Sequence, residues 1–143
     1  LSPGSAERLR AALADLSDIE ILAGGAATTL RIPVRALFPQ ANATLAGGPL
    51  VERLVRALLT EAGSIRVLGF TDSQPERSVA FPSNFALSGA RAKAVRAALA
   101  AKLPDPERIV AEGRAEADPV ATNASAEGRE KNRRIDIVVA IGR

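Results

Sequence analysis

The chain has 143 residues, of which 47% are hydrophobic and 24% charged, values that suit one soluble globular domain with its own core. Its formal net charge is only +3, and four Phe with no Tyr or Trp offer few stacking surfaces, so the usual features of a nucleic-acid binder are missing. The absence of Cys and His excludes disulfides, thiolate chemistry and the zinc, Ser-His and Cys-His hydrolase mechanisms. We therefore expect no metal, no cofactor and no nucleic-acid partner.

The N-terminal segment predicts an amphipathic helix over residues 3–16, because its leucines recur at helical spacing. We expect residues 1–17 to form an N-terminal helix or linker segment and residues 18–143 to form the main domain. The chain starts at Leu1 rather than Met, and no stretch approaches the roughly 20 apolar residues of a membrane span. We therefore expect a processed or excised piece whose membrane anchor would lie upstream.

Beyond the first helix, strands and helices alternate. The expected strands are residues 19–22, 29–34, 64–70, 108–112 and 133–141, and the expected helices are residues 49–61, 88–103 and a short one near Ala126. The first two strands flank Gly24-Gly25, which predicts a hairpin, and residues 35–48 are expected to be irregular. This order predicts a sheet with helices packed on it.

Arg91 is the most informative residue. It shares one face of its helix with an apolar stripe made of Ala94, Val95, Ala98 and Leu99. Lys93 and Arg96 are expected to face solvent on the other side. With Ser88 as the N-cap, Arg91 would lie in the first turn, where the helix dipole disfavours a cation and the free backbone N–H groups of residues 89–91 attract an anion. An internal salt bridge or a snorkelling side chain is the ordinary explanation. The functional explanation is an arginine that binds the carboxylate of a ligand.

Asp72 directly follows the apolar strand that ends at Phe70. Ligands of alternating sheets collect at the carboxyl ends of strands, so an acid there is well placed to bind a cation. An Asx turn is the structural alternative. Because only a loop and a helix start separate Asp72 from Arg91, the two side chains together predict a site for a zwitterion, with one charge for each end of the ligand.

Three blocks of sequence now resemble a known family. The blocks are Gly69–Asp72, Asn84–Ala92 and Asn132–Ile137, and they resemble the G-H-T-D, N-x-x-L-S-x-x-R-A and N-R-R-[VI]-[DE]-[IV] motifs of the OmpA C-terminal domain family. The resemblance covers roughly residues 35–141. The long loop with Phe81-Pro82-Ser83-Asn84 is similar to the versions of this domain in flagellar MotB and in type VI secretion TssL proteins.

The resemblance implies an α+β fold, a βαβαβ-type sandwich with one mixed sheet and helices packed on one face. It also implies a domain that binds peptidoglycan without cleaving it, with Asp72 and Arg91 holding the diaminopimelate of the stem peptide. The other residues that the motifs place at the ligand site are Thr71, Asn84, Leu87 and Arg134. For Arg134, a structural ion pair beside the last strand is an equally good interpretation.

The family also implies a cellular setting and leaves alternatives open. We expect a periplasmic domain that ties an inner-membrane or outer-membrane complex, such as a type VI secretion system or a flagellar stator, to the cell wall; a homodimer is left open. One departure from the motif is Phe70, which replaces the His and is expected to pack into the core. The alternatives are a protein–protein scaffold that has lost wall binding and a wall hydrolase using the acids Glu112, Glu116 or Asp118.

Overall fold

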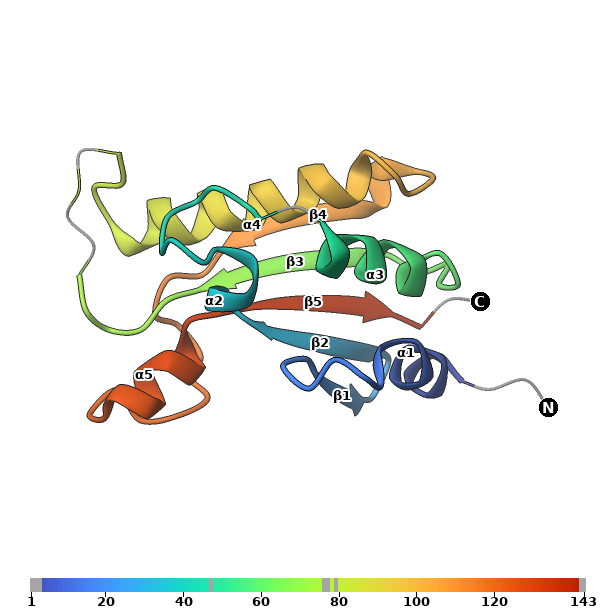
Figure 1. Ribbon diagram of the computed structural model, residues 1–143, viewed down its shortest axis with the longest axis horizontal. Coiled ribbons are helices and arrows are strands. Elements are labelled where there is room, and N and C mark those ends of the chain that lie inside the picture. The colour runs from blue at the N-terminus through green and yellow to red at the C-terminus, as the bar shows by residue number, and fades with distance from the viewer. Residues whose placement is uncertain (1–3, 47, 76–77, 79, 142–143) are drawn as a thin grey trace.

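The computed structural model describes residues 4–46, 48–75, 78 and 80–141. It shows one five-stranded mixed sheet with helices packed against it (Figure 1). Along the chain the elements are α1 (Ser5–Leu13), β1 (Glu20–Gly24), β2 (Ala27–Pro33), α2 (Val34–Leu37), α3 (Pro49–Leu58), β3 (Ile65–Phe70), α4 (Asn84–Ala100), a 3₁₀ turn (Pro106–Arg108), β4 (Ile109–Gly113), α5 (Ala126–Asn132) and β5 (Arg134–Ala140). The predicted α+β class and the single mixed sheet are confirmed.

The strand order is β1-β2-β5-β3-β4, so the last strand of the chain lies at the centre of the sheet. β5 is antiparallel to both β2 and β3, whereas β3 and β4 are parallel and are connected through α4. The predicted hairpin is present, with Glu20 opposite Arg31 and a tight turn in which Gly25 has a φ of 56°. That positive φ suits glycine, because other residues meet a steric penalty there.

The core lies between the sheet and its helices. Ile135, Ile137 and Val139 of β5 are fully buried, as their alternation predicts. α4 packs on β3 and β4, while α1 packs on α3 and β1. Figure 1 shows α1 and α5 at opposite ends of the sheet. Within the described residues, no helix is long and apolar enough to span a membrane.

Helix α4 approaches the sheet very closely at one point. A Cβ on Gly69 of β3 would lie 2.3 Å from the carbonyl oxygen of Ser88, and a Cβ on Gly113 of β4 would lie 2.5 Å from the amide nitrogen of Gly89. Glycine at both strand positions therefore allows the helix backbone to touch the strands. This contact fixes the start of α4 beside the carboxyl end of β3.

Two boundaries differ from the sequence prediction in a way that matters. The long helix begins at Asn84, and its N-cap is Ser83, whose hydroxyl accepts a hydrogen bond from the Ala86 amide at 3.1 Å. The prediction that Ser88 caps this helix is therefore wrong. Ser88 is a buried interior residue whose hydroxyl donates to the Phe85 carbonyl and accepts from the Ala115 amide, both at 3.1 Å.

The second difference is α2, a short helix where part of a strand and an irregular segment were expected. Pro33 precedes it as the N-cap, and Val34, expected in a strand, is its first residue. The segment that follows, residues 38–46, has no regular secondary structure, as predicted. It packs above α4 and becomes part of the candidate site.

Candidate functional site

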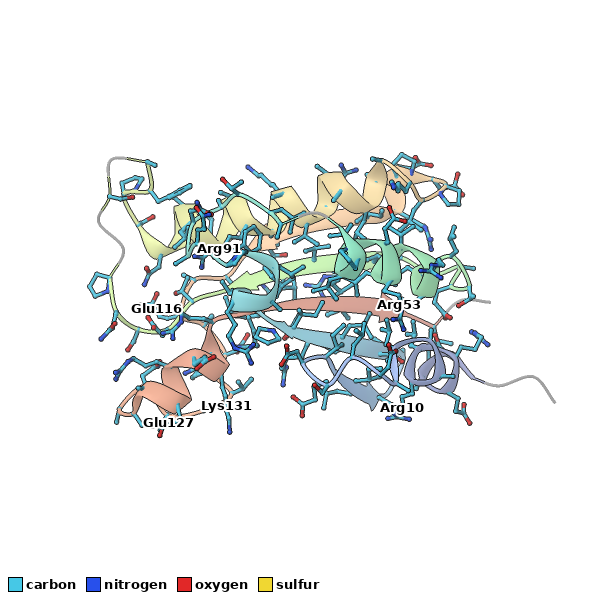
Figure 2. All side chains as sticks on the ribbon, in the orientation of Figure 1. Arg10, Arg53, Arg91, Glu116, Glu127 and Lys131 are labelled. Carbon is cyan, nitrogen blue, oxygen red and sulfur yellow. The ribbon has the colours of Figure 1, made fainter. Side chains whose placement is uncertain are left out.

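The structure brings Asp72 and Arg91 to the same end of the sheet. Asp72 is the second residue after β3, and Arg91 lies on α4 one turn after Ser88, which touches Gly69 of β3. Figure 2 shows Arg91 over the carboxyl end of β3 and Glu116 at the same end of the molecule. The two charged residues of the predicted zwitterion site therefore lie at one end of the sheet, although nineteen positions separate them in sequence.

Asp72 is only 6% exposed, and both of its carboxylate oxygens are engaged. Oδ1 accepts from the Gln74 amide at 2.9 Å, which is the Asx turn considered as the structural alternative. Oδ2 forms an ion pair with Arg133. The structure gives no direct ion pair between Asp72 and Arg91, both of which it describes. The sequence motifs singled out Arg134, and so this partner of Asp72 was missed.

Arg91 is 4% exposed and lies on the apolar stripe, as the helical spacing predicts. Its Nε donates to the Asn42 carbonyl at 2.9 Å, and its guanidinium carbon lies 5.7 Å from the centre of the Phe38 ring. Segment 38–46 thus forms a wall of the site that sequence analysis did not predict.

Because α4 begins at Asn84, the first-turn argument for Arg91 is wrong. Arg91 lies two turns into the helix, so its own amide is inside the helical ladder and the backbone N–H groups of residues 89–91 are not free to bind an anion. Its burial comes instead from the packing of segment 38–46 over α4. Arg96, expected to face solvent, is half-buried and donates to the carbonyls of Ile109 and Pro106.

The three supporting motif residues lie around Asp72. Thr71 is buried, and its hydroxyl donates to the Asp72 carbonyl at 2.8 Å. The side-chain amide of Asn84 donates to the carbonyls of Gln74 at 3.0 Å and Asp72 at 3.4 Å, so it fixes the turn after β3 to the start of α4. Leu87 is buried one turn before Arg91. These contacts position the turn that carries Asp72.

Arg134 lies in a different environment, on the face of the sheet opposite α4. Its guanidinium stacks on the Phe70 ring, 3.8 Å from the centroid, and pairs with Asp136 at 3.3 Å. Burial lowers the pKa of Arg134 below its ordinary value, and the charge of Asp136 acts in the opposite direction. The structure therefore places Arg134 in an internal ion-pair cluster, and Phe70 is buried, as expected, beneath it.

Two asparagines hold the loop before α5 against the turn that carries Asp72. Asn132 is fully buried; its Oδ1 accepts from the Val120 and Ala121 amides, and its Nδ2 donates to Asn123 Oδ1 at 2.9 Å. The same oxygen of Asn123 accepts from the Ser73 amide at 3.3 Å. The asparagine of the N-R-R block is thus a structural brace, a role that its sequence alone did not reveal.

Two surface hollows lie near these elements. An open groove of about 540 Å³ at the start of α4 adjoins the Asp72 turn and is lined by Ser73, Pro75, Pro82, Ser83, Asn84, Phe85, Ala115 and Glu116. A second hollow, of about 660 Å³, lies between α5 and the β1–β2 hairpin, where Arg35 pairs with both Asp18 and Glu130. Of the candidate site residues, Asn84 alone lines the first hollow, which also takes in Ser73 beside Asp72. The second hollow is crossed by ion pairs of the protein itself.

The acids considered for a hydrolase, among them Glu112 and Asp118, lack the surroundings that a catalytic pair of acids needs. Arg114 hydrogen bonds to Glu112 and lowers the pKa of that carboxyl, whereas a general acid at neutral pH needs a raised pKa. Asp118 is exposed and forms a long contact of 3.7 Å with Arg114. Among the residues that the structure describes, no group of three or more acids could hold a metal ion.

Comparison with known proteins now adds to this geometry. Residues 37–133, about two thirds of the chain, match the model of the OmpA family. The chain belongs to the OmpA family. The cell wall anchor of the type VI secretion system from Pseudomonas aeruginosa superposes with a TM-score of 0.87 at 36% identity, covering 96% of this chain and 97% of that one.

Two further proteins are similar to this chain. A putative MotB-like protein from Desulfovibrio vulgaris superposes with a TM-score of 0.89 at 25% identity, covering 96% of this chain and 92% of that one. The peptidoglycan-binding protein ArfA of Mycobacterium tuberculosis is 37% identical over 75 residues, which are 52% of this chain and 22% of ArfA. The chain spans 29% to 55% of the length of the first curated relatives that it matches. The predicted similarity to the type VI secretion and MotB versions of the domain is confirmed.

Proposed function

We propose that this OmpA-family domain binds peptidoglycan without cleaving it and holds the diaminopimelate of the stem peptide between Asp72 and Arg91. The observation that carries the proposal is the pair itself: two buried side chains of opposite charge come to one end of the sheet. Burying charged groups costs free energy, so we expect such an arrangement only where it serves binding or stability.

The chemistry of diaminopimelate matches the two groups. The end of its side chain carries an ammonium and a carboxylate on one carbon. The Asp72 carboxylate would accept hydrogen bonds from the ammonium, and the planar guanidinium of Arg91 would bind the carboxylate in a bidentate manner. Thr71, Asn84 and Leu87 would hold the turn and the helix start that define the distance between the two charges. Arg134 would support the site from beneath through Phe70.

The proposed setting is the periplasm, where the domain ties a membrane complex to the cell wall. The similarity to a type VI secretion cell wall anchor and to a MotB-like protein supports this setting. We propose that an upstream anchor connects the domain to an inner-membrane or outer-membrane complex. A second copy of the chain is a further candidate partner.

Co-sedimentation with purified sacculi tests the proposal. We expect the domain to pellet with diaminopimelate-type peptidoglycan, and Asp72→Ala and Arg91→Ala each to lose most binding, because either change leaves one end of the ligand zwitterion unpaired at a cost of about 2–5 kcal/mol. Glu107→Ala and Arg56→Ala serve as matched controls, since both remove an exposed charge elsewhere on the domain.

Three other outcomes would contradict the proposal. If both site variants pellet like the parent, the ligand binds elsewhere. If the parent fails to pellet at low and moderate salt, the scaffold function is favoured. If sacculi release soluble muropeptides on incubation with the domain, the domain is an enzyme.

A further inference from the structure

Arg133 has a fixed backbone and an exposed side chain. Its amide donates to the Arg129 carbonyl at 3.1 Å, and its carbonyl accepts from the Val34 amide at 2.9 Å, so the backbone is held on both sides. The side chain is 40% exposed, and within the described part of the chain Asp72 is the one side chain with which its guanidinium forms an ion pair or hydrogen bond. The neighbouring Arg134 is the opposite case, enclosed by Asp136, Phe70 and the Asp118 carbonyl.

The Asp72 carboxylate determines what can replace Arg133. Its side chain is 8% exposed, and its Oδ1 is already satisfied by the Gln74 amide. If Arg133 moved away, Oδ2 would be left as a buried, unpaired charge, which costs several kcal/mol. Only another cation removes that penalty. A ligand with an ammonium can therefore exchange with Arg133 at little net cost, whereas a neutral ligand cannot.

We propose that Arg133 is a displaceable counter-ion of Asp72 that determines which stem peptides the domain selects. This inference rests on the proposed function and goes beyond it. In the free domain Arg133 occupies Asp72; in the complex the ligand ammonium takes its place. The released guanidinium, still tethered at the start of β5, then turns onto the carboxylate beside that ammonium and shares it with Arg91.

The exchange makes a specific demand on the ligand. Diaminopimelate offers both the ammonium that displaces Arg133 and the carboxylate that receives it. Lysine, which occupies the same position in other peptidoglycans, offers the ammonium alone. Arg133 competes with the ammonium of both ligands for Asp72. Once displaced, it can bind only the carboxylate of diaminopimelate, so it is a specificity-determining residue.

The test measures the affinity of two synthetic tripeptides, L-Ala-γ-D-Glu-diaminopimelate and L-Ala-γ-D-Glu-Lys, which differ by one side-chain carboxylate. For Arg133→Ala we expect the affinity for the diaminopimelate peptide to fall about tenfold relative to that for the lysine peptide, the value of one charge-assisted contact, because loss of the competing arginine favours both peptides equally. The lysine peptide should bind as well as to the parent or more tightly, because its competitor is gone. The ratio of the two affinities, diaminopimelate over lysine, is the quantity that decides the test and should fall by about tenfold.

Arg133→Gln keeps a hydrogen-bond donor near Asp72 without the charge and protects the test if Arg133→Ala is poorly folded. Lys131→Ala, which removes an exposed cation two positions away, is the matched control and should leave the ratio unchanged. If Arg133→Ala and Arg133→Gln weaken both peptides equally, or leave both unchanged, Arg133 is only structural and the inference is overturned while the proposed function stands. If neither peptide binds the parent, the proposed function fails and the inference fails with it.

Discussion

Asp72 and Asp136 are buried almost equally, at 6% and 4% exposed, yet they lie in different kinds of surroundings. Asp136, on β5, binds Arg31 through both oxygens at 3.0 Å and also contacts Arg134. Asp72, in the turn after β3, is held by one backbone amide and one partly exposed arginine. Burial alone therefore does not separate a structural carboxylate from a ligand-binding one.

The two aspartates differ in how tightly the surrounding structure holds their arginine partners. The Asp136 cluster is closed, because Arg134 is stacked on Phe70 and Arg31 is paired from the neighbouring strand. We propose that Asp72 can exchange its partner, because the side chain of Arg133 is 40% exposed. A buried charge whose counter-ion is partly exposed is therefore the better candidate for a binding site.

The largest expected effect is a loss of stability in Asp136→Ala. The change leaves Arg134 buried without a carboxylate, and breaking a buried pair in this way costs about 3–5 kcal/mol. Urea denaturation of the variant should show that loss in the free energy of unfolding. Asp18→Ala removes an exposed partner of Arg35 and should change it by no more than about 0.5 kcal/mol. Equal stability of Asp136→Ala and the parent would erase the distinction between the two aspartates.

Asp72→Ala should show the reverse pattern. The free energy of unfolding should fall by only about 1 kcal/mol, because the guanidinium of Arg133 is partly exposed and water can hydrate it once the carboxylate is removed. Wall binding should fall by about 2–5 kcal/mol, at least about thirtyfold in affinity. Denaturation and sacculus binding measured on the same protein preparation check both numbers. An Asp72→Ala domain that is badly destabilised would place Asp72 among the structural carboxylates.

Gly69→Ala should have an intermediate effect on stability. It disturbs the contact of α4 with β3 near Asp72 and leaves the Asp136 cluster intact. The new methyl group would meet the Ser88 carbonyl oxygen at 2.3 Å and push α4 away from β3, with a cost of about 1–3 kcal/mol from overpacking. Gly69 faces α4, whereas Asp136 pairs with Leu68 on the opposite face of the sheet. Sacculus binding should therefore weaken more than unfolding alone explains. Binding at the parental level in the folded variant would show that the position of α4 is not critical.

The smallest effect concerns Glu61, a third buried carboxylate, which ties α1 to the end of α3. Burial raises its pKa, but hydrogen bonds from Arg8, Ser5 and Thr60 outweigh burial and lower it below 4.5. Because the folded pKa is the lower one, the stabilisation is complete above about pH 4.5 and is lost as the pH falls through the folded value. Stability measured between pH 3 and 7 should fall less steeply at the acid end for Glu61→Gln than for the parent. Identical slopes would mean that Glu61 makes no such contribution.

The strands and the class of fold could be predicted because their signals are local. The alternation in residues 135–139 and the glycines of the hairpin specify β5, β1 and β2 without reference to the rest of the chain. The start of α4 could not be predicted in the same way. Ser83 and Ser88 both suit an N-cap, and the choice depends on the contact of Ser88 with Gly69, which exists only in the folded domain.

The candidate site also contains residues that the sequence identified and residues that only the folded structure revealed. The motifs and helical spacing identified Asp72 and Arg91, but the partner of Asp72 depends on how α5 meets β5. One signal for Arg134 was present in the sequence: residues two apart in a strand share a face, so Arg134 must lie beside Asp136. Arg133, just before the strand, was then the arginine available for the Asp72 turn. The wall formed by segment 38–46 has no local signal, because an irregular segment places its carbonyls by tertiary packing.

The most direct test of the central claim is an NMR titration of the isotope-labelled domain with free meso-diaminopimelate. We expect backbone shifts to concentrate at residues 70–72 and 84–92, and the side-chain resonances of Arg91 and Arg133 to move with them. Arg35 and Lys131, beside the other hollow, should stay unchanged. Shifts confined to that hollow, or no shifts at millimolar ligand, would contradict a zwitterion site between Asp72 and Arg91.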